Sequence, residues 1–208
     1  MGQGIRERQR EQTRGTLLAQ SRRLFATRGY AAVGLAEIVR VAGVTKGALY
    51  HHFPGKAELF RAVLAEVQQD VGQQVAAAAD AHADPWAQLV AGCQEFLTAS
   101  TDPAVRRIML VDGPAVLGWR QWRALDEATS GRHLAEALTA VVDAGIIPRQ
   151  PVGPLTHLLS GAMNEAALWL AESVDPDDLA ATRAALTNLL HALRCGGPAD
   201  RTGVGPGR

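Results

Sequence analysis

The chain has 208 residues, of which 47% are hydrophobic, so it can build a substantial core. Its charged start has no apolar stretch behind it, and its longest apolar-looking stretch, 155–171, is interrupted by His157, Asn164 and Glu165. These features argue against a secretory signal and a membrane span, and we expect a globular cytoplasmic protein without a membrane partner. The two cysteines, Cys93 and Cys195, lie far apart without ligand-like spacing, which disfavours a disulfide and a zinc site.

The formal net charge is zero, but the charge is unevenly distributed. Residues 1–60 hold ten basic and four acidic residues, a local charge of +6, which leaves −6 on the other 148 residues. Such a distribution suits a protein that places one end on a phosphate backbone and keeps the other end away from it. Most charge runs are only solvated faces, however, so charge alone leaves nucleic-acid binding open.

Ala and Leu dominate the chain, and apolar residues recur every three or four positions. β-Branched and aromatic residues are sparse, so these patterns predict an all-α fold of about nine helices, with a short N-terminal bundle and a larger C-terminal one. The first 80 residues contain four predicted helices: one that ends at Gly29, two short ones at about 35–42 and 46–52, and a longer one from Lys56 to about Ala79.

The later helices are predicted from their caps. An Asp-Pro pair places a side-chain acceptor at the N-cap and a ring with a preset backbone angle at the first helical position. Three such pairs and the weaker Gly153-Pro154 predict helix starts near residues 84, 102, 153 and 175. We also expect a break or kink at Gly113-Pro114, a helix of about 120–144 that ends at Gly145, and a disordered tail in residues 195–208.

Residues 35–53, LAEIVRVAGVTKGALYHHF, have the features of a helix-turn-helix. Gly43 can take the left-handed conformation at the turn, and Thr45 can cap the second helix. That second helix should bury Leu49 and Phe53. A plain pair of antiparallel helices has similar spacing, so the spacing alone does not decide between the two interpretations.

The outward positions of the second helix carry side chains suited to DNA. Lys46 can reach guanine edges, and Gly47 or Ala48 can touch a thymine methyl group in the major groove. Contacts to the DNA backbone are predicted nearby, because Tyr50, His51 and Lys56 are placed to hydrogen-bond its phosphates. The residues predicted here to bind DNA are therefore Thr45, Lys46, Gly47, Ala48, Tyr50, His51 and Lys56.

The TetR family of bacterial transcription regulators has a DNA-binding region that residues 13–64 resemble almost end to end. The resemblance rests on the LF…GY end of the first helix, the AGVTKGALYHHF core and the GKAELF segment. The two lysines of the chain, Lys46 and Lys56, fall where that family contacts DNA. Two later segments, 106–127 and 161–171, look similar to a recurrent C-terminal subtype of the same family.

The resemblance implies a domain organisation and a mechanism. Residues 1–56 would form an arm and a helix-turn-helix domain, and residues 57–194 a ligand-binding and dimerisation domain. The implied protein is a homodimer, expected to be a repressor, that binds a palindromic operator in double-stranded DNA through two recognition helices. A small ligand in the C-terminal bundle would tilt the long helix from Lys56 and lower the affinity for DNA. No cofactor is implied.

The sequence departs from the family pattern in one place. Where the family usually has a Thr followed by Ser or Thr, this chain has Val33 and Gly34. Gly34 can still serve as an N-cap and belongs to the predicted DNA-binding residues, but a hydroxyl contact to phosphate is lost. We expect the Arg-rich segment from Arg6 to Arg14 to compensate by attracting phosphates, although an arm this exposed could equally be disordered.

Two C-terminal stretches have strong apolar stripes, at 155–170 and 179–193. They can pack within the subunit, or pair with their copies to form a four-helix dimer interface. Pattern alone leaves both arrangements open.

A small and largely apolar ligand should lie in the C-terminal bundle. Most apolar residues there are expected to be core. Asn164 is the strongest candidate contact because a buried amide must find a partner, and a hydrogen bond across a dimer interface is the other role open to it. The candidates are Trp86, Phe96, Met109, Leu110, Trp119, Trp122, Leu138, Met163, Asn164 and Trp169.

Enzymatic activity is disfavoured. His51 and His52 are adjacent, so on a helix they point about 100° apart and cannot chelate one metal. None of the metalloprotease, serine hydrolase or phosphate-loop motifs occurs. We predict no catalytic residue and no metal site, and the competing hypothesis is a helical ligand-binding or scaffold dimer with weakened DNA binding.

Overall fold

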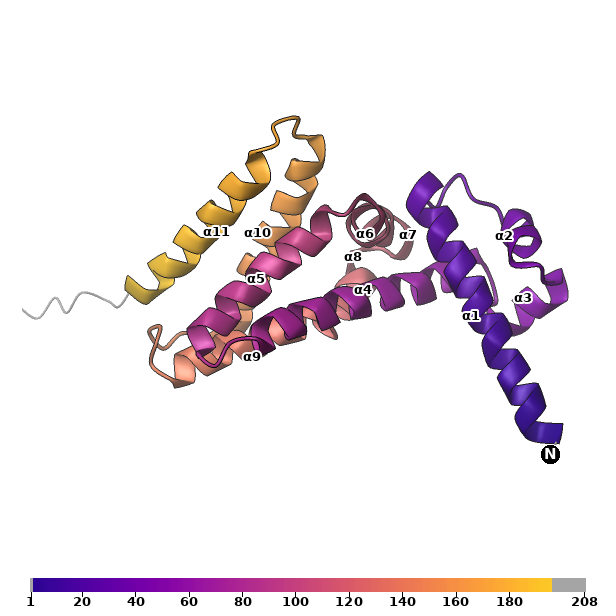
Figure 1. Cartoon of the computed structure of the whole chain (residues 1–208), viewed down its shortest axis with the longest axis horizontal. Helices are drawn as coiled ribbons and strands as arrows, with labels where there is room; N and C mark the ends of the chain where they lie inside the picture. Colours follow the sequence, from indigo (N-terminus) through magenta and orange to yellow (C-terminus); the bar gives the residue numbers. More distant parts are fainter. Residues whose placement is uncertain (1, 196–208) are drawn as a thin grey trace, which may run out of the picture.

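The computed structural model describes residues 2–195, and within them every regular element is helical (Figure 1). The all-α prediction is therefore confirmed. The described residues form eleven α-helices and one π-helical segment, labelled η1. Their bounds are α1 Gly2–Arg28, α2 Leu35–Ala42, α3 Lys46–His52, α4 Lys56–Asp80, α5 Pro85–Thr101, α6 Pro103–Arg106, η1 Arg107–Asp112, α7 Gly113–Leu117, α8 Trp119–Glu127, α9 Ser130–Asp143, α10 Val152–Glu172 and α11 Asp178–Cys195.

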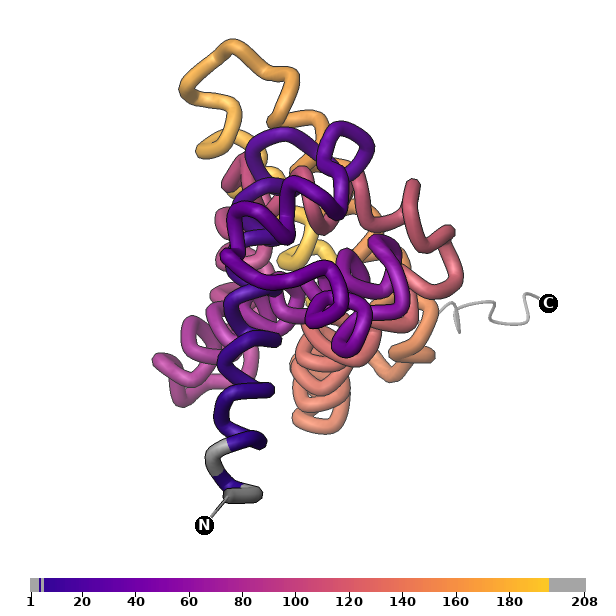
Figure 2. Tube along the Cα trace, turned by 90° about the vertical axis from the view of Figure 1, so that its right-hand side faces the viewer, coloured from indigo at the N-terminus to yellow at the C-terminus, as the bar shows by residue number. Residues whose placement is uncertain are grey.

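The helices α1 to α3 form a small unit at one end of the molecule, and α4 runs from this unit into the larger bundle of α5 to α11 (Figure 1). Viewed from that end, α1 to α3 lie in front of the later helices (Figure 2). The Arg-rich segment from Arg6 to Arg14 is part of α1 and is helical rather than disordered. The predicted tail, 195–208, lies outside the described residues apart from Cys195, where α11 ends.

An aromatic cluster holds the N-terminal unit against the start of α4. The Phe25 and Phe60 ring centroids are 5.3 Å apart, and those of Tyr30 and Phe60 are 5.1 Å apart, in both cases edge to face. Phe25 and Phe60 are fully buried. Because aromatic pairs add to the apolar area that they bury, this cluster fixes α1 on α4.

The predicted caps form where the sequence places an acceptor. The Asp84 carboxylate accepts the Ala87 N–H at 2.8 Å and starts α5, and the Asp102 carboxylate accepts two N–H groups at the start of α6. The start predicted near residue 175 is displaced, because Asp175 caps a turn and α11 begins at Asp178. The helix start predicted near 153 is observed at Val152.

Two predictions about the middle of the chain were wrong in detail. The predicted helix of about 120–144 is interrupted at Ala128 and Thr129, which separate α8 from α9. The chain also stays helical through Gly113-Pro114, and the disturbance takes the form of the π-helical segment η1 just before it. A wider turn avoids the clash that the proline ring would make with the preceding turn of an α-helix.

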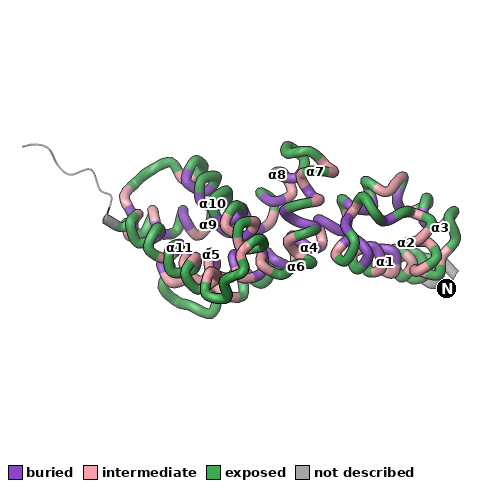
Figure 3. Tube along the Cα trace, turned by 90° about the horizontal axis from the view of Figure 1, so that it is seen from above, coloured by how far each residue is buried: buried purple, intermediate pink, exposed green. Residues whose placement is uncertain are grey.

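Buried positions run along the inner faces of α4 and α5, whereas α2 and α3, at the end remote from α11, are mostly half-buried or exposed (Figure 3). Across residues 2–195, no helix combines the length and the apolar character needed to cross a membrane.

Candidate nucleic-acid interface and internal cavity

The helix α3 is fixed on one side and open on the other. Leu49 is fully buried and Phe53 is 4% exposed, so these two side chains anchor the helix in the core of the N-terminal unit. Thr45 caps the helix, since its Oγ1 accepts the Ala48 N–H at 3.1 Å. With this anchor, the face opposite Leu49 is held rigidly toward solvent.

The predicted DNA-binding residues of α3 occupy that open face. Thr45, Lys46, Gly47, Tyr50 and His51 are exposed, while Ala48 is half-buried. The Lys46 ammonium lies 5.9 Å from the centroid of the Tyr50 ring, a weak cation–π contact that leaves both side chains accessible. The face therefore offers cationic and hydrogen-bonding groups to a groove.

The turn before α3 has the geometry that a helix-turn-helix requires. Gly43 has a φ of 65°, which only glycine adopts readily, and it ends α2. The Val44 N–H donates to the Val39 carbonyl at 3.2 Å. This tight junction sets the angle at which α3 leaves α2.

The position where the chain departs from the family pattern has a structural explanation. Val33 is 1% exposed and packs in the core, while Gly34 is exposed and serves as the N-cap of α2. The Gly34 carbonyl accepts the Glu37 and Ile38 N–H groups, at 3.1 and 3.2 Å. The apolar side chain at position 33 thus contributes to packing, and no hydroxyl is present to donate to a phosphate.

Basic residues of α1 adjoin the end of α3. The Arg14 guanidinium lies 5.6 Å from the Phe53 ring centroid. The pKa of His52 is lowered by burial first and then by the charges of His51, Arg10 and Arg14, which places these groups close together. The cationic surface therefore extends from α3 onto α1.

The two lysines lie in different surroundings. Lys46 is exposed, whereas Lys56 is half-buried at the start of α4 with its ammonium 4.0 Å from the Tyr30 ring centroid. Burial lowers the pKa of Lys56, and the nearby Asp112 carboxylate opposes that shift. Lys56 is thus positioned over the Tyr30 ring, with the Asp112 carboxylate near enough to affect its pKa.

A contact missed by the sequence analysis joins the two parts of the molecule. The Asp112 carboxylate, at the end of η1, accepts the backbone N–H of Tyr30 at 2.8 Å. Tyr30 follows Gly29, which ends α1 with a φ of 79°. Because the two residues are 82 positions apart in sequence, no local pattern could have indicated this contact.

The side chain of Trp122, on α8, supports η1 from behind. Its Nε1–H donates to the Met109 carbonyl at 2.7 Å, and the residue is 3% exposed. Gly113 leaves room for the ring, because a methyl group at that position would lie 2.8 Å from Trp122 Cδ1. A chain of direct contacts thus runs from α8 through η1 to Tyr30 and Lys56.

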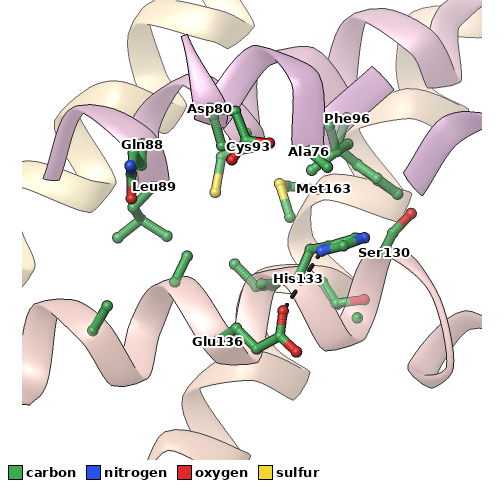
Figure 4. A pocket seen from close by; sticks show the side chains of 18 of the residues that line it. Ala76, Asp80, Gln88, Leu89, Cys93, Phe96, Ser130, His133, Glu136 and Met163 are labelled. Carbon is green, nitrogen blue, oxygen red and sulfur yellow. Dashed lines mark ion pairs between the residues drawn. The ribbon is translucent and has the colours of Figure 1, made fainter. Parts of the chain in front are cut away.

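A cavity of about 330 Å³ lies inside the C-terminal bundle between α4, α5 and α9, with α8 and α10 at its inner end. Figure 4 shows Gln88, Leu89, Cys93 and Phe96 on one side of it, and His133 and Glu136 on the other. Burial raises the pKa of the Cys93 thiol to about 12. The volume is in the range of small-molecule sites.

The predicted ligand residues are divided between this cavity and the rest of the core. Phe96 and Met163 line it. Trp122 packs under η1, and Trp119 is 65% exposed beside it, with their ring centroids 4.9 Å apart. Met109 and Leu138 are buried in the core outside the cavity wall, as are Leu110, Trp86 and Asn164, while Trp169 is exposed.

Buried polar groups form the inner end of the cavity. Asp126 is 2% exposed, and its Oδ2 accepts from Arg123 Nη1 at 3.2 Å and, more weakly, from the Ser160 hydroxyl at 3.5 Å. Arg123 also donates to His157 Nδ1 at 2.6 Å and to Glu127. Burial raises the pKa of Asp126, and Arg123 and Ser160 oppose the shift.

Asp112, His157 and Glu165, which could form a catalytic group only if they met in space, lie apart. Asp112 contacts Tyr30, His157 contacts Arg123, and Glu165 is exposed on α10. Among the described residues, no group of three or more His, Cys, Asp or Glu side chains could hold a metal ion.

The outer faces of α10 and α11 expose apolar side chains. Leu158 is 71% exposed, Trp169 52% and Leu189 48%. Asn164, also on α10, is 9% exposed, and its Oδ1 has no hydrogen-bond partner within residues 2–195. Large exposed apolar residues on neighbouring helices are typical of a subunit interface.

Comparisons with known proteins agree with this geometry. Residues 17–63 match the profile described as bacterial regulatory proteins of the tetR family, and residues 86–193 match that of the tetracyclin repressor-like C-terminal domain. The HTH-type transcriptional regulator LmrA of Bacillus subtilis is 36% identical over 86 residues, which are 41% of this chain and 44% of LmrA. The HTH-type transcriptional activator FasR of Mycolicibacterium smegmatis is 38% identical over 93 residues, 45% of this chain and 34% of FasR.

A solved structure is similar over nearly the whole chain. The crystal structure of a TetR-family transcriptional regulator from Pectobacterium atrosepticum has 33% sequence identity and a TM-score of 0.73, and the match covers 89% of this chain and 95% of that one. The protein described here is thus a helix-turn-helix transcription regulator with a DNA-binding N-terminal domain. It belongs to the TetR family.

Proposed function

We propose that the protein is a ligand-responsive repressor that binds a palindromic operator as a homodimer. The observation that carries the proposal is the open face of α3, anchored by Leu49 and Phe53 at the tip of a cationic unit. A dimer would present two copies of α3 to successive major-groove faces, roughly 34 to 36 Å apart. Because it acts on DNA, such a protein works in the cytoplasm.

We assign the DNA contacts in two groups. Thr45, Lys46, Gly47 and Ala48, at the start of α3, would reach base edges. Backbone phosphates would be held by Tyr50, His51, Lys56 and the N–H groups that follow Gly34. The arm and DNA-binding domain would extend over residues 1–56, and the ligand-binding and dimerisation domain over 57–194.

The dimer interface would be formed by α10 and α11. Their exposed apolar side chains, including Leu158 and Leu189, would be buried when these helices pair with their copies in a four-helix arrangement. Asn164 would then find the hydrogen-bond partner for its Oδ1 at the interface.

The ligand would act through α8. A molecule in the cavity contacts α8 at Asp126, one turn after Trp122, whose ring supports η1. Movement of η1 would disturb the bond from Tyr30 to Asp112 and the position of Lys56, and so the spacing of the two recognition helices. The ligand would thereby favour a state with low affinity for DNA, and no chemical step is required. Neither an enzymatic activity nor a cofactor enters this mechanism.

Fluorescence anisotropy with labelled DNA from the flanks of the protein's own gene tests the proposal. We expect salt-sensitive binding that prefers a palindrome over scrambled DNA. Lys46→Ala should weaken binding about 10- to 100-fold and lower the salt dependence. A matched control is Arg149→Ala, which removes one exposed positive charge from the loop between α9 and α10 and should leave binding unchanged.

The competing hypothesis is a ligand-binding or scaffold dimer whose DNA binding has weakened. It predicts that the wild-type protein is a folded dimer that binds no DNA sequence in preference to others at any salt concentration. A strictly monomeric particle in sedimentation would contradict both hypotheses.

A further inference from the structure

We propose that the ligand of the cavity is an organic cation, an apolar molecule whose protonated amine faces Asp126. The inference rests on the proposed function, because it assumes that the cavity between α4, α5 and α9 is the regulatory site.

The cavity is elongated and has an apolar middle. Its inner end lies near Gly72 on α4, where Ser130 and His133 approach, and Asp80 lies at the other end. Eight residues of α-helix separate these two points of α4, or about 12 Å. Val75, Phe96 and Leu134 are among the side chains that line the space between them. This shape suits a ligand with an apolar body and one polar end.

The charged groups that line the cavity are acidic. Its titratable wall residues are Asp80, Asp126, His133, Glu136 and the thiol of Cys93. In the described part of the chain, no Lys or Arg contributes to this wall. A ligand carboxylate or phosphate would therefore lose its hydration without gaining a charged partner, which is costly in a buried site.

The inner end carries an excess negative charge. The Arg123 guanidinium donates both to Asp126 and to Glu127, at 3.2 and 3.3 Å, so one cation is shared by two carboxylates. The guanidinium also contacts the Ser160 hydroxyl at 3.1 Å and His157 Nδ1 at 2.6 Å. Arg123 and the two carboxylates together carry a formal charge of −1.

The rest of the wall does not reverse this charge. Glu136 Oε1 is 3.1 Å from Arg132 Nη1, and Glu136 Oε2 is 3.6 Å from His133 Nδ1, a contact that Figure 4 shows as a dashed line. Asp80, at the other end, forms no ion pair with any described residue. From end to end, the cavity thus favours positive charge.

A protonated amine satisfies the inner end better than a neutral donor does. It donates to the Asp126 carboxylate and to the Ser160 oxygen, and its charge balances the carboxylate that Arg123 shares. A hydroxyl can donate one hydrogen bond but leaves the charge uncompensated. The difference between the two should be large because Asp126 is buried, where charges are weakly screened.

Three probes that share one apolar body test the proposal: 4-phenylbutylamine, 4-phenylbutanol and 4-phenylbutyrate. Isothermal titration calorimetry on the full chain at pH 7 gives the Kd of each. We expect the amine to bind at least tenfold more tightly than the alcohol, and the butyrate more weakly than both. Equal affinity for all three, or tighter binding of the alcohol or the butyrate, overturns the proposal.

Substitutions test whether the preference for the amine arises at the inner end of the cavity. Asp126→Asn should weaken the amine at least tenfold and leave the alcohol unchanged. Glu127→Gln, at a half-exposed position, should weaken the amine more modestly, because Arg123 then neutralises Asp126 fully. The matched control is Asp143→Asn, which removes an exposed carboxylate at the end of α9 outside the cavity wall and should change neither probe. Equal loss of amine and alcohol in Glu127→Gln contradicts the proposal even if Asp126→Asn fails to fold.

The same preparations distinguish the failure of this inference from that of the proposed function. If the protein binds DNA in the anisotropy assay but shows no preference for the amine, the proposed repressor function stands and the proposal of a cationic ligand fails. Conversely, an amine preference that leaves DNA binding unchanged supports the cation site and contradicts the ligand-release mechanism.

Discussion

The two parts of the chain place their functional groups in opposite ways. The N-terminal unit is packed tightly on α4 through the aromatic cluster of Phe25, Tyr30 and Phe60, and it carries its polar groups outside on α3. The C-terminal bundle leaves a cavity of about 330 Å³ in its interior and buries Asp126 and Ser160 beside it. A surface that reads DNA needs a rigid support, whereas a site for a small molecule needs unfilled space, which costs packing energy.

The largest effect should come from the support of α3. Leu49→Ala removes a fully buried side chain and should lower the free energy of unfolding by about 2–5 kcal/mol, with loss of DNA binding. Tyr50→Ala, on the open face of the same helix, should change stability far less. Urea unfolding followed by circular dichroism measures both variants. Similar losses of stability in the two would contradict the division into an anchored and an open face.

The next effect concerns the junction between the two parts. Asp112→Ala leaves the Tyr30 N–H without its acceptor and should cost about 1–3 kcal/mol of unfolding free energy. Asp112→Asn keeps a side-chain acceptor and should cost less. If urea unfolding gives equal losses for the two variants, the charge of Asp112 near Lys56, which both variants remove, dominates the junction and the hydrogen bond does not.

Filling the cavity should have a smaller effect of opposite sign. Ala137→Leu adds apolar volume to the wall and should raise the free energy of unfolding by about 0.5–1 kcal/mol, because empty space is replaced by contacts. Thermal unfolding detects this gain. A marked loss of stability would mean that the side chain cannot enter the space, and would contradict a cavity open at Ala137.

The smallest effect is a dependence on pH. Burial raises the folded-state pKa of Asp126 above the ordinary value of 3.8, so the folded protein takes up this proton before the unfolded chain does. The stability of the wild type relative to Asp126→Asn should therefore increase as the pH falls from the raised pKa toward 3.8, and should level off below it. Urea unfolding of both proteins at several acidic pH values measures the difference, and a difference that decreases on acidification would reverse the assigned direction of the shift.

The helices could largely be predicted because their signals are local. Thr45 before α3, Asp84 before α5 and Gly43 after α2 satisfy or end the backbone of the helix beside them, so a few neighbouring residues decide each boundary. The interruption at Ala128 and Thr129 was not predicted, although Ser130-Gly131, a pair typical of turns, directly follows it. The π-helical form of η1 was also missed, because a proline motif indicates a disturbance without its shape.

The candidate cavity was harder to predict than the recognition helix. Phe96 and Met163 are on its wall, but Trp119, Trp122, Met109, Leu138 and Asn164 are not. Apolar residues on a helix look alike in sequence whether they face a core or a cavity, since both are buried. Asp126, which lines the inner end, carries no motif, and its burial depends on Arg123 and Ser160, the latter on another helix.

The sequence by itself determined the helical fold, the position of the helix-turn-helix and which face of α3 is open, because periodicity, caps and a glycine turn act over a few residues. Only the tertiary structure decided that Asp112 accepts the Tyr30 N–H and that Lys56 lies on the Tyr30 ring. Arg123 pairs with Asp126 and Glu127 at local helical spacing, but only the packing of α8 against α10 and α9 places this group beside the cavity and against Ser160. The contacts of Asp112 and Lys56 join residues distant in sequence, and the position of Asp126 depends on where whole helices pack, so no local pattern encodes them.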